Sequence, residues 1–140
     1  MKNLRDWGIP LGRRFRALKL WFLLRDQGVE GIQARIRRDL ENTRWLATQV
    51  DAAPLWERLA PAPLQTVCLR HKPEGLAGAT LDAHNLRLAQ AVNASGRAYL
   101  TPSVVKGVQL IRVSLGTEAT ERSDVEALWA LLNETAATVS

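Results

Sequence analysis

A narrow apolar stripe between residues 29 and 50 constrains the fold of this chain more than any other feature. Its members recur at steps of three or four residues, which is the period of an α-helix buried along one side. We therefore expect a helix over residues 29–50, ended by Ala52, Ala53 and Pro54, that packs one face on a core. The stripe consists of Ile32, Ile36, Leu40, Thr43, Leu46 and Val50, and the side chains predicted to point away from it are Arg35, Arg38, Asp39 and Asn42.

The preceding stretch, residues 12–27, predicts a helix of a different kind. Its apolar residues form two sets at helical spacing that together occupy well over half of the circumference. A helix that is apolar nearly all round is normally buried on most sides, so we expect this one to need a partner surface. Gly28 is predicted to cap its C-terminus. The two sets are Phe15, Leu18, Trp21 and Phe22, and Ala17, Leu20 and Leu24.

After residue 54 the pattern changes to short strands and shorter helices. Proline-bearing connections and turn residues separate the segments. Short strands packed on one side by helices make an α+β domain of two layers, which is the fold class that we expect. The predicted elements are strands over 56–59 and 64–70, a helix over 80–94, strands over 97–101 and 108–115, and a helix over 121–135.

Turn and capping residues support these boundaries. Lys106-Gly107 suits the turn between the last two strands. Thr80 is predicted to cap the helix over 80–94. Thr120 or Ser123 can cap the last helix, and Ser123 would form a capping box with the glutamate three residues later.

Composition excludes several classes of protein. The longest apolar run, 20–24, is far shorter than the ~20 residues of a membrane-spanning helix. We see no secretory signal at the start, and the one cysteine, Cys68, cannot form an internal disulfide, which together indicate the reducing cytoplasm. The two histidines, His71 and His84, are too few for a metal site, and His71 would face away from Cys68. We therefore expect no metal.

Positive charge is concentrated in the first part of the chain. Residues 1–50 carry eleven Lys/Arg against five Asp/Glu, whereas the remainder carries eight against nine. A basic half of this kind could bind nucleic acid or acidic lipid. The alternative is that the arginines make ion pairs and solvate two helices, and we favour it because no nucleic-acid-binding motif accompanies the charge. We expect neither a membrane nor a nucleic-acid partner.

The opening segment carries a specific resemblance. From Trp7 to Phe22 the chain reads Trp-x-Ile-Pro-Leu-Gly-Arg-Arg-Phe-Arg-x-Leu-Lys-x-Trp-Phe. This resembles the start of the C-terminal domain in group II pyridoxal-phosphate-dependent amino-acid decarboxylases, and the rest of the chain is similar to that domain in order and spacing. The resemblance implies the small domain of fold type I pyridoxal-phosphate enzymes, a mostly antiparallel four-stranded sheet with helices on one face, preceded by two helices. Residues 1–11 would then be an extended lead-in from the large domain, and 12–140 the small domain.

The resemblance also implies roles for several residues. Arg5 matches an arginine close to the active site, and Gly12 matches a position facing the substrate pocket, where Gly leaves room for an aromatic substrate. Arg13 and Arg16, with Arg14, match an arginine cluster that could instead form ion pairs at the domain interface. Arg112 could bind a substrate carboxylate, as a small-domain arginine does in the related aminotransferases, or could pair with an acid of the large domain.

Pyridoxal phosphate is the cofactor that the resemblance implies, yet its attachment point is missing. Decarboxylation needs a lysine that forms a Schiff base with the cofactor. In the family this lysine lies in a His-Lys-Trp motif upstream of the region matched here, and the one His-Lys pair of this chain, His71-Lys72, is followed by Pro73. We read it as a coincidental surface pair, and expect no catalytic and no cofactor-binding residue in these 140 residues.

Two hypotheses about function follow. The first is the C-terminal portion of a carboxy-lyase for aromatic amino acids, inactive by itself, whose partner is the decarboxylase large domain or a homodimer partner. The second is a non-enzymatic interaction domain that docks on a decarboxylase subunit.

Overall fold

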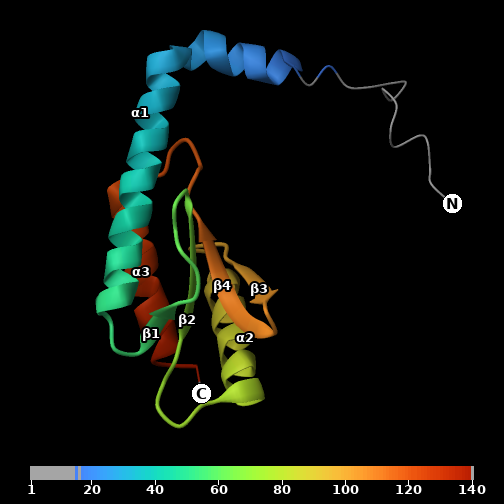
Figure 1. The fold of residues 1–140 in the computed structure, drawn as a ribbon, viewed down its shortest axis with the longest axis vertical. Coiled ribbons are helices and arrows are strands. Elements are labelled where there is room, and N and C mark those ends of the chain that lie inside the picture. Colours follow the sequence, from blue (N-terminus) through green and yellow to red (C-terminus); the bar gives the residue numbers. More distant parts are fainter. Residues whose placement is uncertain (1–14, 16, 140) are drawn as a thin grey trace, which may run out of the picture. The chain divides into compact units, whose positions relative to one another are not determined.

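The computed structural model describes residues 15 and 17–139, and the chain divides into two compact units, Met1–Arg35 and Ile36–Ser140, which we treat separately (Figure 1). Among the described residues, no helix is both long enough and apolar enough to cross a membrane. The elements in chain order are α1 (Ala17–Ala52), β1 (Trp56–Arg58), β2 (Thr66–His71), α2 (Gly78–Ala94), β3 (Thr101–Val105), β4 (Val108–Ser114) and α3 (Arg122–Ala136).

Helical geometry is interrupted once within α1, at the residue predicted to end the first helix. Gly28 has φ 65° and ψ 174°, so the helix consists of two stretches on either side of it. A left-handed φ is readily adopted by glycine, which has no Cβ to clash. The break at Gly28 is therefore confirmed, while the predicted start at residue 12 lies outside the described residues.

In the first unit, most of the large apolar side chains of α1 are exposed. Trp21 and Phe22 are each more than half exposed and contact one another edge to face, with ring centroids 5.2 Å apart. Leu20 and Leu24 are exposed as well, and the guanidinium of Arg25 lies 5.9 Å from the centre of the Trp21 ring. This stretch is apolar around much of its surface, as the sequence predicted.

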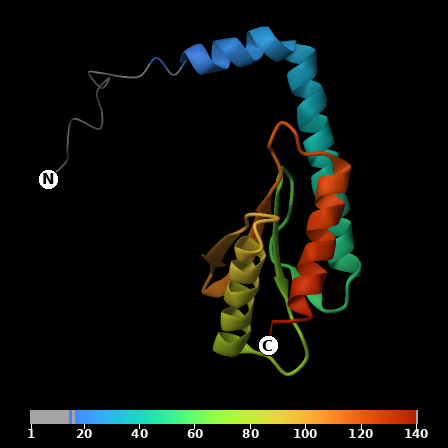
Figure 2. The same ribbon diagram turned by 180° about the vertical axis from the view of Figure 1, so that it is seen from behind.

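The second unit is built on an antiparallel sheet with the strand order β1-β2-β4-β3. Figure 2 shows α2 and α3 on the same side of this sheet. The core lies between the layers: β2 and β4 contribute alternate residues in register, and Val67 faces Val113 while Leu69 faces Ile111. The predicted two-layer α+β architecture is confirmed. Helix residues that join this core include Leu46, Val50, Leu88, Val92, Val125 and Leu132.

The second half of α1 buries a different face from the one predicted. Thr43, Leu46 and Val50 are buried as expected, but so are Asp39 and Asn42, which were predicted to point outward. The reason is that the connections flanking the sheet cover this part of the helix: Gln65 donates a hydrogen bond of 2.8 Å to the Asp39 carboxylate. Arg38 donates to the backbone oxygen of Glu118, just before α3.

Other boundaries also differ from the predictions. The predicted strand over 97–101 is wrong, since β3 begins at Thr101. The segment before it is fixed instead by Asn93, whose side-chain amide bonds both the N–H and the C=O of Leu100. The N-cap of α2 is Ala77, without a side-chain cap, and the hydroxyl of Thr80 donates to the Ala77 oxygen.

The capping box of α3 also lies elsewhere than predicted. The N-cap is Glu121, and its partner three residues later is Asp124, so neither Thr120 nor Ser123 caps the helix. The backbone N–H of Glu121 donates to the Asp124 carboxylate at 2.8 Å. The side chains of Glu121 and Asp124, three residues apart, therefore form the capping box that the sequence analysis assigned to Ser123 and the glutamate three residues later.

The turn between β3 and β4 is confirmed as a two-residue hairpin. Lys106 and Gly107 both have positive φ, 51° and 79°, between the paired residues Val105 and Val108. Two consecutive left-handed residues match a type I′ turn, whose twist suits an antiparallel hairpin.

Alanine at Gly107 is therefore expected to lower the free energy of unfolding by roughly 1–2 kcal/mol, because a Cβ opposes the left-handed backbone. Urea denaturation would measure it. The matched control is Gly116→Ala, where a Cβ would meet its nearest atom at an ordinary 3.8 Å and no left-handed φ occurs. The control should leave stability unchanged or raise it by up to about 1 kcal/mol. Equal losses in both variants would contradict the turn assignment.

Candidate functional site

Most residues given roles by the resemblance lie outside the described part of the chain. Arg5, Gly12, Arg13 and Arg16 belong to the residues whose structure is not described. Their roles therefore stay predictions. Arg112 is the member of the set that the structure places.

Arg112 lies in the middle of β4, exposed, on the sheet face opposite the core. Its neighbours in register are Cys68 on β2 and Thr101 on β3. Because alternate residues of a strand share a face, Arg70 lies on this same side of the sheet. Arg70 forms an ion pair with Glu57 of β1, and Lys72 lies 3.4 Å from the same carboxylate. This face thus presents an arginine at its centre and a cluster of charged side chains at one end.

The His71-Lys72 pair is not the surface pair that the sequence suggested. Lys72 is exposed, but His71, the last residue of β2, is only 7 % exposed and belongs to the interior. The strand alternation places Cys68 and His71 on opposite faces, as predicted.

The structure brings the two histidines together, which sequence reasoning missed. Nδ1 of His71 and Nε2 of His84 are 2.9 Å apart, inside the hydrogen-bond range. Burial lowers the pKa of both imidazoles, and each is lowered further by a nearby positive charge, that of His84 on His71 and that of Arg87 on His84. A signal was present in the sequence: His84 lies at helical spacing between Leu81 and Leu88, which both face the core.

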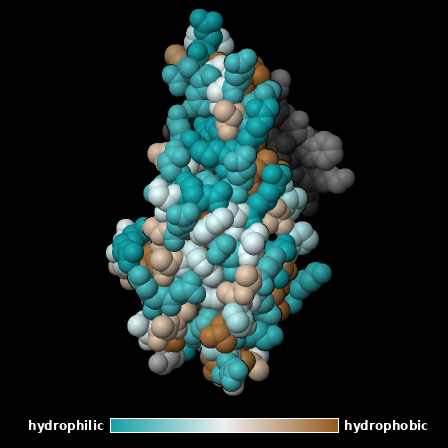
Figure 3. All heavy atoms as spheres, turned by 90° about the vertical axis from the view of Figure 1, so that its left-hand side faces the viewer, coloured by the Kyte–Doolittle hydropathy of each residue, from teal (hydrophilic) through white to brown (hydrophobic). Residues whose placement is uncertain are grey.

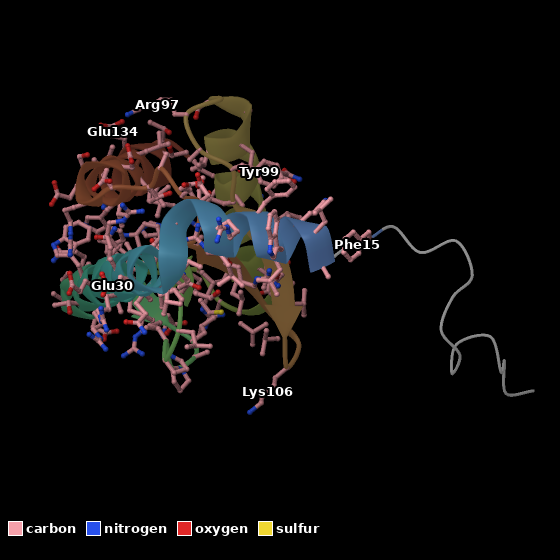
Figure 4. The ribbon with its side chains drawn as sticks, turned by 90° about the horizontal axis from the view of Figure 1, so that it is seen from above. Phe15, Glu30, Arg97, Tyr99, Lys106 and Glu134 are labelled. Carbon is pink, nitrogen blue, oxygen red and sulfur yellow. The ribbon has the colours of Figure 1, made fainter. Side chains whose placement is uncertain are left out.

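The second unit contains several hollows, of which two are described. The larger, of about 400 Å³, has an apolar floor that includes Leu115, Val125 and Leu128, with Arg97 and Tyr99 also in its lining. Figure 4 shows Arg97 beside Glu134, with which it forms an ion pair of 3.2 Å. The smaller, of about 260 Å³, is lined by apolar residues together with Trp56, His71 and Asn133. A lysine lines neither of these two cavities.

The described lysines are exposed. Lys106 projects from the tip of the β3–β4 hairpin (Figure 4), and Lys19 lies on α1. Within residues 15 and 17–139, no three His, Cys, Asp or Glu side chains are grouped so that they could hold a metal ion. In the second unit, the side that carries α3 and the second half of α1 shows hydrophilic residues interspersed with apolar ones (Figure 3). Arginine contacts on these two helices include Arg38 with Glu121 and Arg122 over the Trp45 ring.

Comparison with known proteins identifies the family. Residues 1–72 match the family described as "Pyridoxal-dependent decarboxylase conserved domain". Tryptophan decarboxylase TDC1 of Camptotheca acuminata is 36% identical over 133 residues, which make up 94% of this chain and 26% of that protein.

Solved structures agree with this match. The Catharanthus roseus tryptophan decarboxylase in complex with L-tryptophan superposes with a TM-score of 0.82 at 31% identity, over 98% of this chain and 28% of that one. Rhodiola rosea 4-hydroxyphenylacetaldehyde synthase superposes with a TM-score of 0.83 at 33% identity, over 100% of this chain and 30% of that one. The chain thus spans about a quarter of the length of its curated relatives, and it belongs to the group II pyridoxal-phosphate-dependent amino-acid decarboxylase family.

Proposed function

We propose that this chain is the C-terminal part of a carboxy-lyase for aromatic amino acids, and that it acts in the cytoplasm together with a cofactor-bearing part of the same family. The proposal rests on the match to enzymes named tryptophan and tyrosine decarboxylases. This match covers 94% of this chain and about a quarter of the length of each of those enzymes. Gly12, if it faces the substrate as the resemblance implies, leaves space for an aromatic ring.

The residues described in this chain do not fit pyridoxal phosphate. The cofactor requires a lysine for its aldehyde, an acid for its ring nitrogen and a site for its phosphate, all converging in one cavity. Lys72 is paired with Glu57 on the open sheet face, and Lys106 lies in a hairpin turn. No lysine reaches either of the two cavities. We therefore assign no step of decarboxylation to this chain alone.

Two surfaces support the need for a cofactor-bearing part. In the first unit, Leu20, Trp21 and Phe22 expose apolar area that a soluble protein normally covers. In the second, Arg112 stands on the uncovered sheet face, where it can bind a substrate carboxylate or pair with an acid of the large domain. In this proposal the chain provides a docking surface and one positioned guanidinium.

The test uses the purified chain, alone and co-expressed with a large domain of the family. Alone, titration with pyridoxal phosphate should give no aldimine absorbance band of micromolar affinity, and tryptophan or tyrosine should give no amine. Co-expression should restore amine formation. A Lys72→Arg variant tells whether any weak aldimine forms at Lys72, because aldimines on the other surface amines would survive the substitution. Amine formation by the chain alone, or an aldimine of micromolar affinity in the unmodified chain, would contradict the proposal.

An interaction domain without any part in catalysis is the second candidate, and the exposed Trp21 and Phe22 favour it. Light scattering on the same samples distinguishes the two. A stable complex with the large domain that never forms amine supports the interaction domain. A clean monomer at high concentration that also fails to bind the large domain contradicts both.

A further inference from the structure

Two buried imidazoles form part of the contact between the end of β2 and α2. His71 ends β2 and His84 lies in the second turn of α2; their side chains are 7 % and 2 % exposed. The next residue of α2, Asn85, accepts a hydrogen bond from the backbone N–H of His71 and donates one to its C=O, both at 2.8 Å. The end of β2 is therefore held on α2 by one side-chain pair and two backbone bonds.

The geometry of the pair favours one arrangement of protons on the two rings. A hydrogen bond between two ring nitrogens needs one N–H and one lone pair. Nδ1 of His84 is buried and has no partner in the described part of the chain. A lone pair is less unfavourable to leave unpartnered there than an N–H, so the favoured arrangement has His84 donating from Nε2 to Nδ1 of His71.

Adding protons works against this arrangement. A first proton on His84 would place a charged N–H at the buried, unpartnered Nδ1. A proton on both rings would put N–H groups on both of the nitrogens that now lie 2.9 Å apart, and the hydrogen bond could not persist. The pair is compatible with two neutral rings and incompatible with two charged ones.

The charged groups of the neighbouring elements do not compensate an added proton. On α2, Arg87 opposes positive charge on His84, and Asp82 is engaged by the backbone N–H of Gln109 of β4. On the opposite sheet face, Arg70 of β2 and Lys72, just after β2, both pair with Glu57 of β1. From β1 and α3, His71 meets the Trp56 ring, 4.9 Å away, whose N–H donates to Asn133. In α3, the next residue, Glu134, is paired with Arg97.

We propose that the His71–His84 pair is an acid-sensitive contact, which separates β2 from α2 when the imidazoles take up protons and thereby weakens the fold at mildly acidic pH. The sign follows from linkage. The pKa of both rings is lowered in the folded chain, whereas in the unfolded chain it is about 6.5. Stability is thus fully present above about pH 6.5 and falls as pH drops below it, by up to about tenfold in the folding equilibrium constant per histidine and pH unit.

The chain offers an unusually clean test, because it contains two histidines in all and both belong to the pair. Other side chains of ordinary pKa do not change charge between pH 5 and 7. Urea unfolding of the chain is measured from pH 7.5 to 5.0. We expect the folding equilibrium constant to fall by up to about thirtyfold between pH 6.5 and 5.5, because each unfolded imidazole is already half-protonated at pH 6.5. A wild-type stability that is flat across this range would overturn the proposal.

A variant and a spectroscopic measurement separate the pair from other acid effects. His84→Gln keeps an amide donor for His71 but cannot titrate, so it should lose at least half of the slope, and retention of the full slope would contradict the proposal. Long-range proton–nitrogen NMR on the wild-type chain gives the second readout, independent of whether the variant folds. Both rings should be neutral at pH 6.5, with Nδ1 of His84 unprotonated. Titration of either ring near 6.5 in the folded chain would overturn the assignment.

Discussion

Replacing Leu88 by alanine is expected to lower the free energy of unfolding by about 2–5 kcal/mol. Leu88 is fully buried on the inner face of α2, in the core formed with β2 and β4. Removing its isobutyl group loses the transfer free energy of the buried methyl groups and leaves a cavity that the sheet cannot close by a small movement. Urea-induced unfolding of the second unit, monitored by circular dichroism, measures the change in free energy.

The same helix supplies the matched control. Leu86 lies two residues away and is 37 % exposed. The same chemical change, Leu86→Ala, removes the same atoms from a partly solvated position, so the loss should stay below about 1 kcal/mol. Equal losses in the two variants would show that α2 does not bury the face described here.

Replacing Asn85 by alanine is the second large effect, expected to lower the free energy of unfolding by about 2–4 kcal/mol. Its side chain is completely buried and bonds the backbone of His71 on both its N–H and its C=O, and the Leu81 oxygen as well. Alanine would leave the N–H and C=O of His71 buried without their partner, and an unsatisfied buried backbone group is strongly unfavourable.

Asn93 gives the comparison for this prediction. It stands eight residues further along α2 and makes the equivalent pair of bonds to Leu100, but it is only half-buried. Leu100 is itself buried, but the Asn93 side chain is partly solvated and already competes with water for its hydrogen bonds, so we expect a smaller loss, of about 1–2 kcal/mol. Chemical denaturation of both variants at pH 7.5, where the imidazoles are neutral, measures the difference. A larger loss at Asn93 than at Asn85 would contradict the burial of the His71 backbone.

The features that sequence predicted correctly are those set by neighbours along the chain. The break at Gly28 and the turn at Lys106-Gly107 follow from backbone conformations that glycine tolerates. The strand over 108–115 follows from its local sequence and is observed as β4, Val108–Ser114. These local rules sufficed for the element order and the two-layer architecture.

The errors arose where distant segments meet. Asp39 is buried where the side chain of Gln65, 26 residues later, donates a hydrogen bond to its carboxylate. The residues next to Asp39 in the sequence do not indicate this contact. The predicted strand at 97–101 failed because the Asn93 amide takes the place of a neighbouring strand at Leu100. The histidine pair depends on packing β2 against α2. Of the candidate site, the structure describes Arg112, which is exposed on β4, while the roles of Arg5, Gly12, Arg13, Arg16 and Arg112 stay predictions.

The order of the strands has a consequence for how the chain behaves at high concentration. β1 and β3 are the outer strands, and unpaired outer strands can recruit further chains into fibres. β1 is three residues long and carries Glu57 and Arg58, and β3 contains Pro102, which has no N–H to donate. Both borders of the sheet are therefore poor templates for amyloid-like growth, so self-association of this chain should proceed through side chains and not through added strands.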